Sequence, residues 1–286
     1  MTPDPGASQQ PPAAVLFDYA GTLFDDTSVI RPHRLAAQCA LRGRRISMAR
    51  AARLCAALLH AVDSPEGRAR RADADLSPDR HRAAWTQLAR AAPGSDALIA
   101  DAFYACVTGA DGWHPYPDTG PVLAALHAAG IPVAVVSNTG WDIRGSFAAA
   151  GLTRLVAAFV LSCDLGVQKP DPEIFRTACA LLGTDPARAL MVGDDPAKDG
   201  AAAAVGIPVY VLPTDRGPAR PRGLTAVLGL FPSLGSLGSL GSLGSLGSLG
   251  SLRSLRSLRS LGTLRSLGTL RPNSPPAPAN RRDGSP

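Results

Sequence analysis

The sequence predicts an α/β protein, in which a doubly wound parallel sheet carries an inserted all-helical subdomain and is followed by a disordered low-complexity tail. Three observations support this class. Short apolar runs alternate with helix-like stretches after residue 117, an Ala/Arg/Leu-rich segment separates them from a first apolar run, and a triplet repeat occupies residues 233–271. Strands that alternate with helices are typical of a parallel sheet covered by helices on both faces.

These patterns divide the chain into four parts. Each boundary is placed where the periodicity or the composition changes. The parts are a disordered leader (1–12), an α/β core (13–26 and 117–230), a helical insert (27–116) and a low-complexity tail (231–286).

Apolar runs in the core predict buried strands, and the stretches between them predict helices. A first strand and turn are expected within residues 13–26. Further strands are expected at residues 131–136, 159–161, 189–192 and 208–212. Helices are expected at residues 120–129, 143–150, 172–182 and 200–205.

The insert has the pattern of a helical subdomain. Ser47 precedes residues 48–62 as an N-cap, and Leu54, Leu58 and Val62 recur at helical spacing. The insert carries more Arg than acidic residues, an excess that could help to hold an anionic substrate over the sheet. Solvated helix faces are the alternative explanation for most of these Arg side chains.

The tail repeats the unit Ser/Thr-Leu-Gly/Arg. A period of three matches neither the alternation of a strand nor the turn of a helix, so the leucines cannot gather on one stable face. The repeat contains no proline, which excludes a collagen-like triple helix. We therefore predict a disordered or weakly ordered tail.

Charge and cysteine usage limit the classes of partner and compartment. The net charge of +6 is concentrated in the tail, because residues from Arg216 onward carry +9 and residues 1–215 carry −3. Nucleic-acid binding by the globular part is therefore not expected.

The five cysteines are odd in number, scattered and free of C-x-x-C spacing, which argues for reduced, mostly buried thiols rather than disulfides or a zinc site. No apolar run predicts a membrane span and no signal peptide is indicated, so we expect a cytoplasmic protein.

The first candidate site residue is Asp18, which ends an apolar run. Val-Leu-Phe precedes it at residues 15–17, and Tyr19, Ala20 and the pair Gly21-Thr22 follow. Open α/β sheets bind ligands at the carboxyl ends of their strands, so an Asp at this place is a candidate for chemistry. An Asp that only caps the turn after the strand is the alternative.

Two further candidates carry groups that can bind an anion. Ser137 and Asn138 follow an apolar run, and their hydroxyl and amide groups can donate to a phosphate oxygen, although Ser-Asn-Thr is also ordinary turn chemistry. Lys169 lies in Lys-Pro-Asp-Pro, just ahead of a predicted helix. The chain has only two lysines, Lys169 and Lys198, so a compact ammonium kept here suggests a specific role at a crowded anion site.

An acidic turn follows the expected strand at residues 189–192. Asp194, Asp195 and Asp199 fall within six residues of one another. Carboxylates this close would repel, and a hard divalent cation with oxygen ligands relieves that repulsion. A solvated acidic turn is the alternative.

Taken together and in this order, the four segments resemble the four motifs of the haloacid dehalogenase superfamily of hydrolases. The resemblance covers roughly residues 13–212. It implies a Rossmann-like core sheet, and it implies that the helical insert is a cap, inserted between the first and second motifs, that closes over small substrates.

The resemblance also implies roles for the candidate residues. Asp18 would be the nucleophile that attacks phosphorus, and Mg²⁺ would be the cofactor of a phosphatase acting on a small phosphorylated metabolite. The phosphoryl oxygens would be bound by Ser137, Asn138 and Lys169. The Mg²⁺ ligands would be the Asp18 carboxylate, the Ala20 carbonyl and Asp194, with Asp195 and Asp199 around them. Lys169 would also hold the Asp18 carboxylate.

One position departs from the family pattern. The phosphatases of the superfamily usually carry a second Asp two residues after the nucleophile, which protonates the leaving group and then activates water, and here that position is Ala20. Losing a general acid/base typically costs about 10²–10⁴-fold in rate. Hydrolysis is then expected to be slow, or limited to substrates with good leaving groups.

Three alternatives remain beside the phosphatase. Phosphonoacetaldehyde hydrolase also has Ala at this position, but it needs a cap lysine for its Schiff base and residues 27–116 contain none. A metal-free haloacid dehalogenase would carry Ser and Asn in place of the acidic residues after Gly193. A catalytically weak binding or regulatory protein is supported by Ala20. The sequence leaves the substrate and the oligomeric state open.

Overall fold

The computed structural model describes residues 11–213, 217, 219–231 and 234. All of them belong to one compact unit, which spans Met1–Ser242. The predicted leader therefore lies outside the described residues except at residues 11 and 12. The predicted disorder of the triplet repeat also lies outside them, apart from residue 234.

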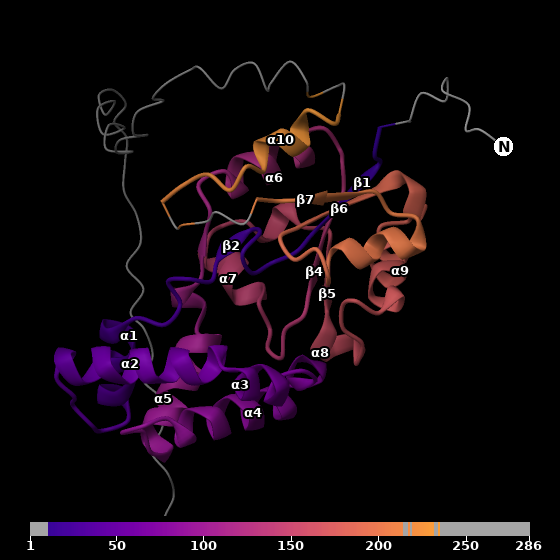
Figure 1. Ribbon diagram of the computed structural model, residues 1–286. Helices are drawn as coiled ribbons and strands as arrows, with labels where there is room; N and C mark the ends of the chain where they lie inside the picture. Colours follow the sequence, from indigo (N-terminus) through magenta and orange to yellow (C-terminus); the bar gives the residue numbers. More distant parts are fainter. Residues whose placement is uncertain (1–10, 214–216, 218, 232–233, 235–286) are drawn as a thin grey trace, which may run out of the picture. The chain divides into compact units, whose positions relative to one another are not determined.

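The core is a five-stranded parallel sheet with the strand order β5-β4-β1-β6-β7 (Figure 1). Val15 on β1 lies opposite Val133 on β4 and Leu190 on β6, so the first strand of the chain occupies the centre of the sheet. The strands are β1 (Ala14–Phe17), β4 (Val133–Ser137), β5 (Ala158–Leu161), β6 (Ala189–Gly193) and β7 (Val209–Val211). They confirm all the strands that the apolar runs predict.

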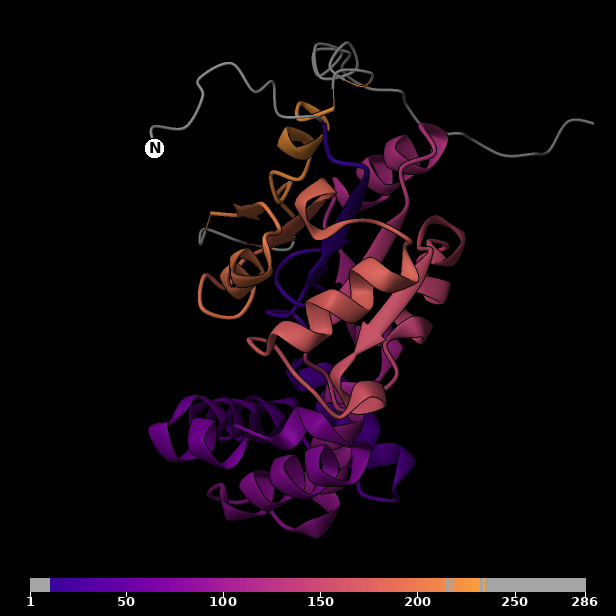
Figure 2. The same ribbon diagram turned by 90° about the vertical axis from the view of Figure 1, so that its right-hand side faces the viewer.

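Helices cover both faces of the sheet. Val15 and Phe17 point to the face covered by α6 (Thr119–Ala128), α7 (Arg144–Ala149) and α10 (Thr225–Leu228). Leu16, between them, points to the opposite face, which packs against α9 (Pro172–Leu181) and η5 (Gly200–Val205). Figure 2 views the molecule from the side of α9. This alternation confirms the predicted doubly wound α/β class.

Short helical segments complete the core. They join the ends of strands and longer helices. They are α8 (Ser162–Leu165), η2 (Ala110–Gly112), η3 (Thr153–Leu155) and η4 (Pro186–Arg188).

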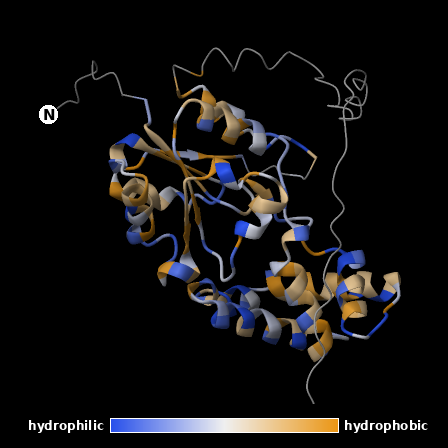
Figure 3. Ribbon diagram, turned by 180° about the vertical axis from the view of Figure 1, so that it is seen from behind, coloured by the Kyte–Doolittle hydropathy of each residue, from blue (hydrophilic) through white to orange (hydrophobic). Residues whose placement is uncertain are grey.

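The insert is entirely helical. It consists of α1 (Pro32–Leu41), α2 (Met48–Asp63), α3 (Pro65–Arg70), η1 (Ala74–Leu76), α4 (Pro78–Ala91) and α5 (Ala97–Thr108). Ser47 caps α2 as predicted, because its side chain accepts from the N–H of Arg50. Leu54, Leu58 and Val62 are buried in the core of the insert, also as predicted. Figure 3 shows hydrophobic and hydrophilic residues interspersed along these helices, as expected of helices with one buried face.

A small antiparallel pair of strands, β2 (Phe24–Asp25) and β3 (His114–Pro115), joins the insert to the core. Nearby, the guanidinium of Arg34 donates to the carbonyl of Cys106 at 2.9 Å and pairs with Asp111 at 2.6 Å. The chain therefore leaves the core and returns to it through one fixed point. The sequence does not predict this pair, because two-residue strands are too short to show a period.

The last described residues are tied to the start of α6. The carboxylate of Asp118 accepts the backbone N–H groups of Arg222, Gly223 and Leu224 at 2.7–2.8 Å. The side chain of Arg222 is buried and donates to the carbonyl of Gly21 at 2.6 Å. A segment near residue 222 thus braces the turn that follows Asp18.

The boundary between core and tail needs a correction. Phe231 and Leu234 were assigned to the tail, yet they are 2% and 5% exposed and belong to the hydrophobic cluster of the core. The first leucine of the triplet repeat does find a buried face, because α10 brings the chain back over the sheet. We therefore propose that the core extends through Leu234.

The cysteines agree with the prediction of reduced, mostly buried thiols. All five are free, and four of them are buried: Cys39, Cys55, Cys106 and Cys179. Across the described part of the chain, no helix is both long enough and apolar enough to cross a membrane.

Candidate active site

Asp18 stands at the carboxyl end of β1. Its backbone N–H donates to the carbonyl of Val192 on β6 at 2.9 Å, and the residue is buried. Burial raises the pKa of its carboxyl group, the Lys169 ammonium lowers it and the Asp199 carboxylate raises it, so that the pKa that results is about 6. The carboxylate therefore needs positive charge close by in order to stay ionised and nucleophilic at neutral pH.

Lys169 supplies one such charge. Its Nζ donates to Oδ1 of Asp18 and to Oδ1 of Asp199, each at 2.6 Å, and 3% of the residue is exposed. Burial lowers its pKa, but the two carboxylates outweigh burial and raise the pKa above its ordinary value. The ammonium is therefore charged, and the structure joins three of the predicted site residues in one buried ion cluster.

Asn138 holds the backbone of Lys169. Its amide nitrogen donates to the carbonyl of Lys169 and its amide oxygen accepts from the N–H of Lys169, each at 2.8 Å. We predicted that this amide would bind substrate. In the structure its side chain is bonded to the Lys169 backbone, and Asn138 lines the cavity together with Ser137 at the end of β4. Its contact with substrate stays a prediction.

The acidic turn after β6 contains two kinds of carboxylate. Asp195 accepts from the N–H groups of Ala197 and Lys198 at 2.9 and 3.1 Å and pairs with the Lys198 ammonium at 3.1 Å. Burial raises the pKa of Asp195, but these contacts lower it below its ordinary value. Asp199 is buried and accepts from the N–H of Asp195 at 3.0 Å as well as from Lys169. Asp195 thus shapes the turn, whereas Asp199 belongs to the ion cluster.

Gly193 allows this turn to fold back on itself. A Cβ atom built on Gly193 would lie 2.1 Å from Oδ2 of Asp199. Any larger residue would displace the Asp199 carboxylate and, through it, the ammonium of Lys169.

The acidic side chains fit a divalent metal ion. Carboxylate oxygens of Asp18, Asp194 and Asp199 all lie within 4.8 Å of one another. One ammonium does not neutralise three carboxylates, and Asp194 adds to the rise in the pKa of Asp18. A hard cation that takes oxygen ligands fits this donor set and would hold Asp18 ionised.

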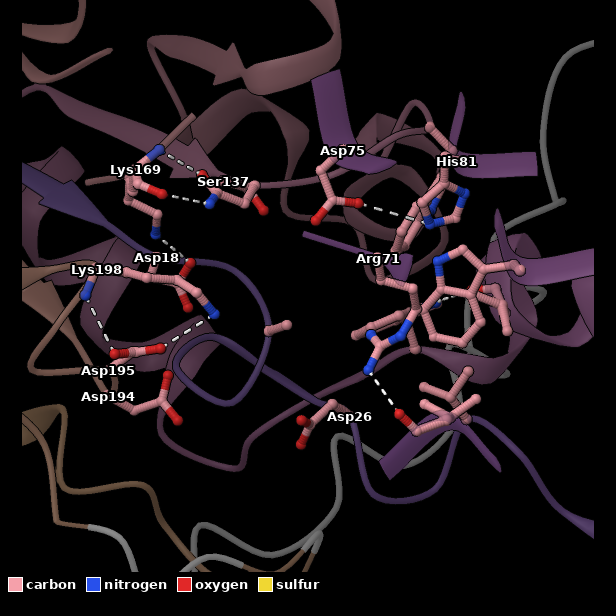
Figure 4. A pocket seen from close by; sticks show the side chains of 18 of the residues that line it. Asp18, Asp26, Arg71, Asp75, His81, Ser137, Lys169, Asp194, Asp195 and Lys198 are labelled. Carbon is pink, nitrogen blue, oxygen red and sulfur yellow. Dashed lines mark hydrogen bonds and ion pairs between the residues drawn. The ribbon is translucent and has the colours of Figure 1, made fainter. Parts of the chain in front are cut away.

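A cavity of about 410 Å³ opens over the ion cluster, which is a volume suited to a small molecule. Figure 4 shows its polar side chains in two groups that face each other. The core contributes Asp18, Ser137, Lys169, Asp194, Asp195 and Lys198. The cap contributes Arg71, Asp75 and His81, none of which was predicted.

Aromatic rings line the cap side of this cavity. The guanidinium of Arg71 lies 4.8 Å from the ring centroid of Trp85, and the His81 ring lies 5.0 Å from that of Trp141. The chain has only three Trp residues, so each of them could have been a candidate for a place in the site. Spacing alone could not show which rings would face the cavity.

Comparisons with known proteins agree with this geometry. The family model for haloacid dehalogenase-like hydrolases matches residues 12–206. A phosphoserine phosphatase from Thermus thermophilus is 37% identical over 85 residues, which are 29% of this chain and 34% of that protein. A phosphoglycolate phosphatase from Cupriavidus necator is 35% identical over 113 residues, which are 39% and 49% of the two chains.

Dehalogenases are among the similar proteins as well. An (S)-2-haloacid dehalogenase from a Pseudomonas species is 33% identical over 92 residues, which are 32% of this chain and 40% of that protein. The matches to these curated relatives therefore span a third to a half of the relatives' length.

A solved structure of a defluorinating L-2-haloacid dehalogenase aligns with a TM-score of 0.53 at 22% identity, over 73% of this chain and 87% of that one. At this identity the likeness shows the fold alone. The family match, by contrast, spans more than half of the chain and includes the strand ends that carry Asp18, Ser137, Lys169 and Asp194. The chain belongs to the haloacid dehalogenase-like hydrolases.

Proposed function

We propose that this hydrolase is a Mg²⁺-dependent phosphatase that cleaves small phosphate monoesters through an aspartyl-phosphate on Asp18. The observation that carries the proposal is the buried Asp18 carboxylate, bonded to Lys169 and set beside Asp194 and Asp199 beneath a cavity of small-molecule size. The phosphatases among the relatives support the same class of reaction.

The residues of the site fit the two halves of such a reaction. In the first half, an oxygen of Asp18 attacks phosphorus while Lys169 and the Ser137 hydroxyl hold the phosphoryl oxygens. In the second half, water attacks the phosphorus and returns the carboxylate of Asp18. Asn138 contributes by fixing the Lys169 backbone.

Mg²⁺ would be held by Asp18, Asp194 and the backbone carbonyl of Ala20, which lies in the turn that lines the cavity. When bound, it supplies positive charge that offsets the repulsion between the carboxylate and an anionic phosphate. Asp199 stays with Lys169, and Asp195 keeps the acidic turn in shape.

Removing the metal is expected to stop phosphate release. A panel of small alkyl and aryl phosphates would be assayed for inorganic phosphate with Mg²⁺, with excess chelator, and with chelator already saturated with Mg²⁺ as the control. Activity should disappear only with the free chelator and return when Mg²⁺ is restored, because the metal offsets charge at Asp18.

A dehalogenase is the second candidate, since dehalogenases are also among the relatives. Three carboxylates beside one ammonium favour the metal-dependent phosphatase over this reading. Halide release from 2-haloacids at full rate in excess chelator, with no phosphate released from any ester, would overturn the proposed function.

A further inference from the structure

Ala20 lines the cavity but offers no group that can move a proton, so the acid/base must come from elsewhere in the site. The turn η1 of the cap is fixed against the loop that carries Ser137. The hydroxyl of Ser162 donates to the carbonyl of Asp75 at 2.6 Å and accepts from the N–H of Thr139 at 2.9 Å. The Ser162 hydroxyl therefore links the backbone of Asp75 to the backbone of the loop that follows Ser137.

A second bond ties the same part of the cap to the loop that carries Lys169. The side chain of Gln168 donates to the carbonyl of Ala72 at 2.7 Å. The two bonds join the cap to the two core loops that bind the phosphoryl oxygens in the proposed function. Asp75 is therefore held above the reacting centre on a fixed backbone.

The carboxylate of Asp75 lines the cavity on the side opposite Asp18 (Figure 4). Its Oδ1 lies 3.7 Å from Nε2 of His81, and 29% of the side chain is exposed. Burial, and then Arg71, lower the pKa of His81 to about 3, so the imidazole is neutral at physiological pH. The neutral ring therefore packs beside the Asp75 carboxylate without a hydrogen bond to it and without a charge that would neutralise it.

The His81 ring is itself fixed between cap and core. Its Nδ1 lies 3.0 Å from the hydroxyl of Tyr104, and a Cβ atom on Gly140 would lie 2.1 Å from the Cβ of His81. Gly140 follows Thr139 directly, so His81 packs against the same core loop that is bonded to Ser162.

The surroundings let Asp75 exist in both protonation states near neutral pH. Burial raises the pKa of its carboxyl group, Arg71 and then Lys198 lower it, and the pKa that results is about 6. A group with a pKa near the working pH is suited to giving and taking a proton. The titratable and charged groups that face it come from five elements around it: Arg71, His81, Tyr104, Cys163 and Lys198.

From this geometry we propose that Asp75 is the general acid and base of the reaction, a role that the methyl group of Ala20 cannot fill. The inference rests on the proposed phosphatase function. It places a catalytic group on the cap rather than on the turn after the nucleophile.

The first half-reaction transfers the phosphoryl group from the substrate to Asp18. A bond forms between an Asp18 oxygen and phosphorus, the bond from phosphorus to the leaving oxygen breaks, and its electron pair stays on that oxygen. Protonated Asp75 gives its proton to the oxygen. The products are the acyl phosphate on Asp18, the alcohol and the Asp75 carboxylate.

In the second half-reaction the Asp75 carboxylate takes a proton from water as the water oxygen bonds to phosphorus. The bond from phosphorus to Asp18 breaks, and its electron pair returns to the carboxylate. The products are inorganic phosphate, ionised Asp18 and protonated Asp75, so the cycle closes without another reactant.

The substitution Asp75→Asn separates this role from a structural one. Single-turnover formation of alcohol from alkyl phosphates should fall by about 10²-fold or more, because an alkoxide needs a proton to leave. Single-turnover release of p-nitrophenol from p-nitrophenyl phosphate should stay within a few fold, because that anion leaves unprotonated. Steady-state turnover of the aryl ester should then slow, with a burst of p-nitrophenol, since water lacks its base.

The pH profile gives a second readout. In the wild type, kcat/KM for an alkyl phosphate should decline as the pH rises through about 6 and above, because protonated Asp75 is the form that acts. Asp75→Asn should lack this decline. A variant with equal losses on alkyl and aryl esters and an unchanged pH profile would overturn the inference in favour of a structural role.

Asp79→Asn is the matched control, since Asp79 is an exposed carboxylate on the cap that is not among the residues lining the cavity. It should leave the ratio of alkyl to aryl rates unchanged. A rescue test follows, in which Ala20→Asp is added to Asp75→Asn. The double variant should regain alkyl phosphate hydrolysis by about ten-fold or more, because an acid again lies near the leaving oxygen.

These outcomes separate the two proposals. No phosphate release by the wild type from any ester would overturn the proposed function itself. An active wild type with an Asp75→Asn variant that keeps its alkyl rates would overturn only the role of Asp75. A folded double variant no faster on alkyl esters than Asp75→Asn would do the same, because the missing function would not be proton transfer.

Discussion

Asp18→Asn is expected to reduce steady-state phosphate release by about 10⁴-fold or more, because an amide of similar volume is a poor nucleophile. The fold should persist, since Lys169 keeps its bond to Asp199 and the backbone bond from residue 18 to Val192 is untouched. Phosphate release and melting temperature would be measured together. Asp79→Asn, at an exposed carboxylate outside the cavity, serves again as the control that leaves turnover unchanged.

A direct test of the intermediate follows from the same variant. Wild-type protein quenched during turnover and treated with hydroxylamine should carry a hydroxamate on the peptide that contains Asp18, because hydroxylamine attacks acyl phosphates. The Asp18→Asn protein should carry none. A folded variant with full activity would remove Asp18 as the nucleophile.

Lys169→Met is expected to lower both activity and stability. The Asp18 and Asp199 carboxylates would remain buried without the ammonium that lies 2.6 Å from each. Breaking a buried ion pair by removing one partner typically costs about 3–5 kcal/mol. Loss of the phosphoryl-binding charge should lower kcat by about 10²–10³-fold.

The loss of stability in Lys169→Met should become smaller as the pH falls. In the variant the pKa of Asp18, already raised to about 6, rises further because the lowering effect of Lys169 is gone. The folded variant then takes up a proton more readily than the unfolded chain, so its stability improves as the pH falls. Urea unfolding in the presence of chelator should therefore show a larger deficit at pH 8 than at pH 5.

The other lysine is the matched control. Lys198 is 53% exposed at its side chain and forms a surface pair with Asp195, so Lys198→Met should change the free energy of unfolding by less than about 1 kcal/mol. If Lys169→Met were no more destabilising than Lys198→Met at either pH, the buried ion cluster would not hold the site together.

Three residues on the core side of the site could be predicted because each stands at the end of a buried strand. Asp18, Ser137 and Asp194 follow apolar runs, and parallel strands bring their carboxyl ends to one edge of the sheet. We could predict that these residues converge from the apolar runs alone, because apolar runs indicate buried strands and parallel strands end at the same edge of a sheet. The burial of Leu54, Leu58 and Val62 was predictable for a similar reason, since their spacing defines one face of a helix.

The cap side could not be predicted in this way. Asp75 lies in a three-residue turn, and its direction depends on a hydrogen bond from Ser162, far along the chain. The two hydrogen bonds between Asn138 and the Lys169 backbone could not be predicted, because an amide that binds a backbone and one that binds a ligand look alike in sequence. The brace from Arg222 to Gly21 joins two loops that have no period.

The position of β1 at the centre of the sheet affects the order in which the parts of the chain can fold during synthesis. The β1 strand leaves the ribosome before its neighbours β4 and β6, which begin at residues 133 and 189. Pairing over such separations carries a high entropy cost of loop closure, whereas α1, α2, α4 and α5 contact one another within a single segment. The cap can therefore fold before β1 pairs with β4 and β6, and during that interval the nascent chain exposes an unpaired apolar strand.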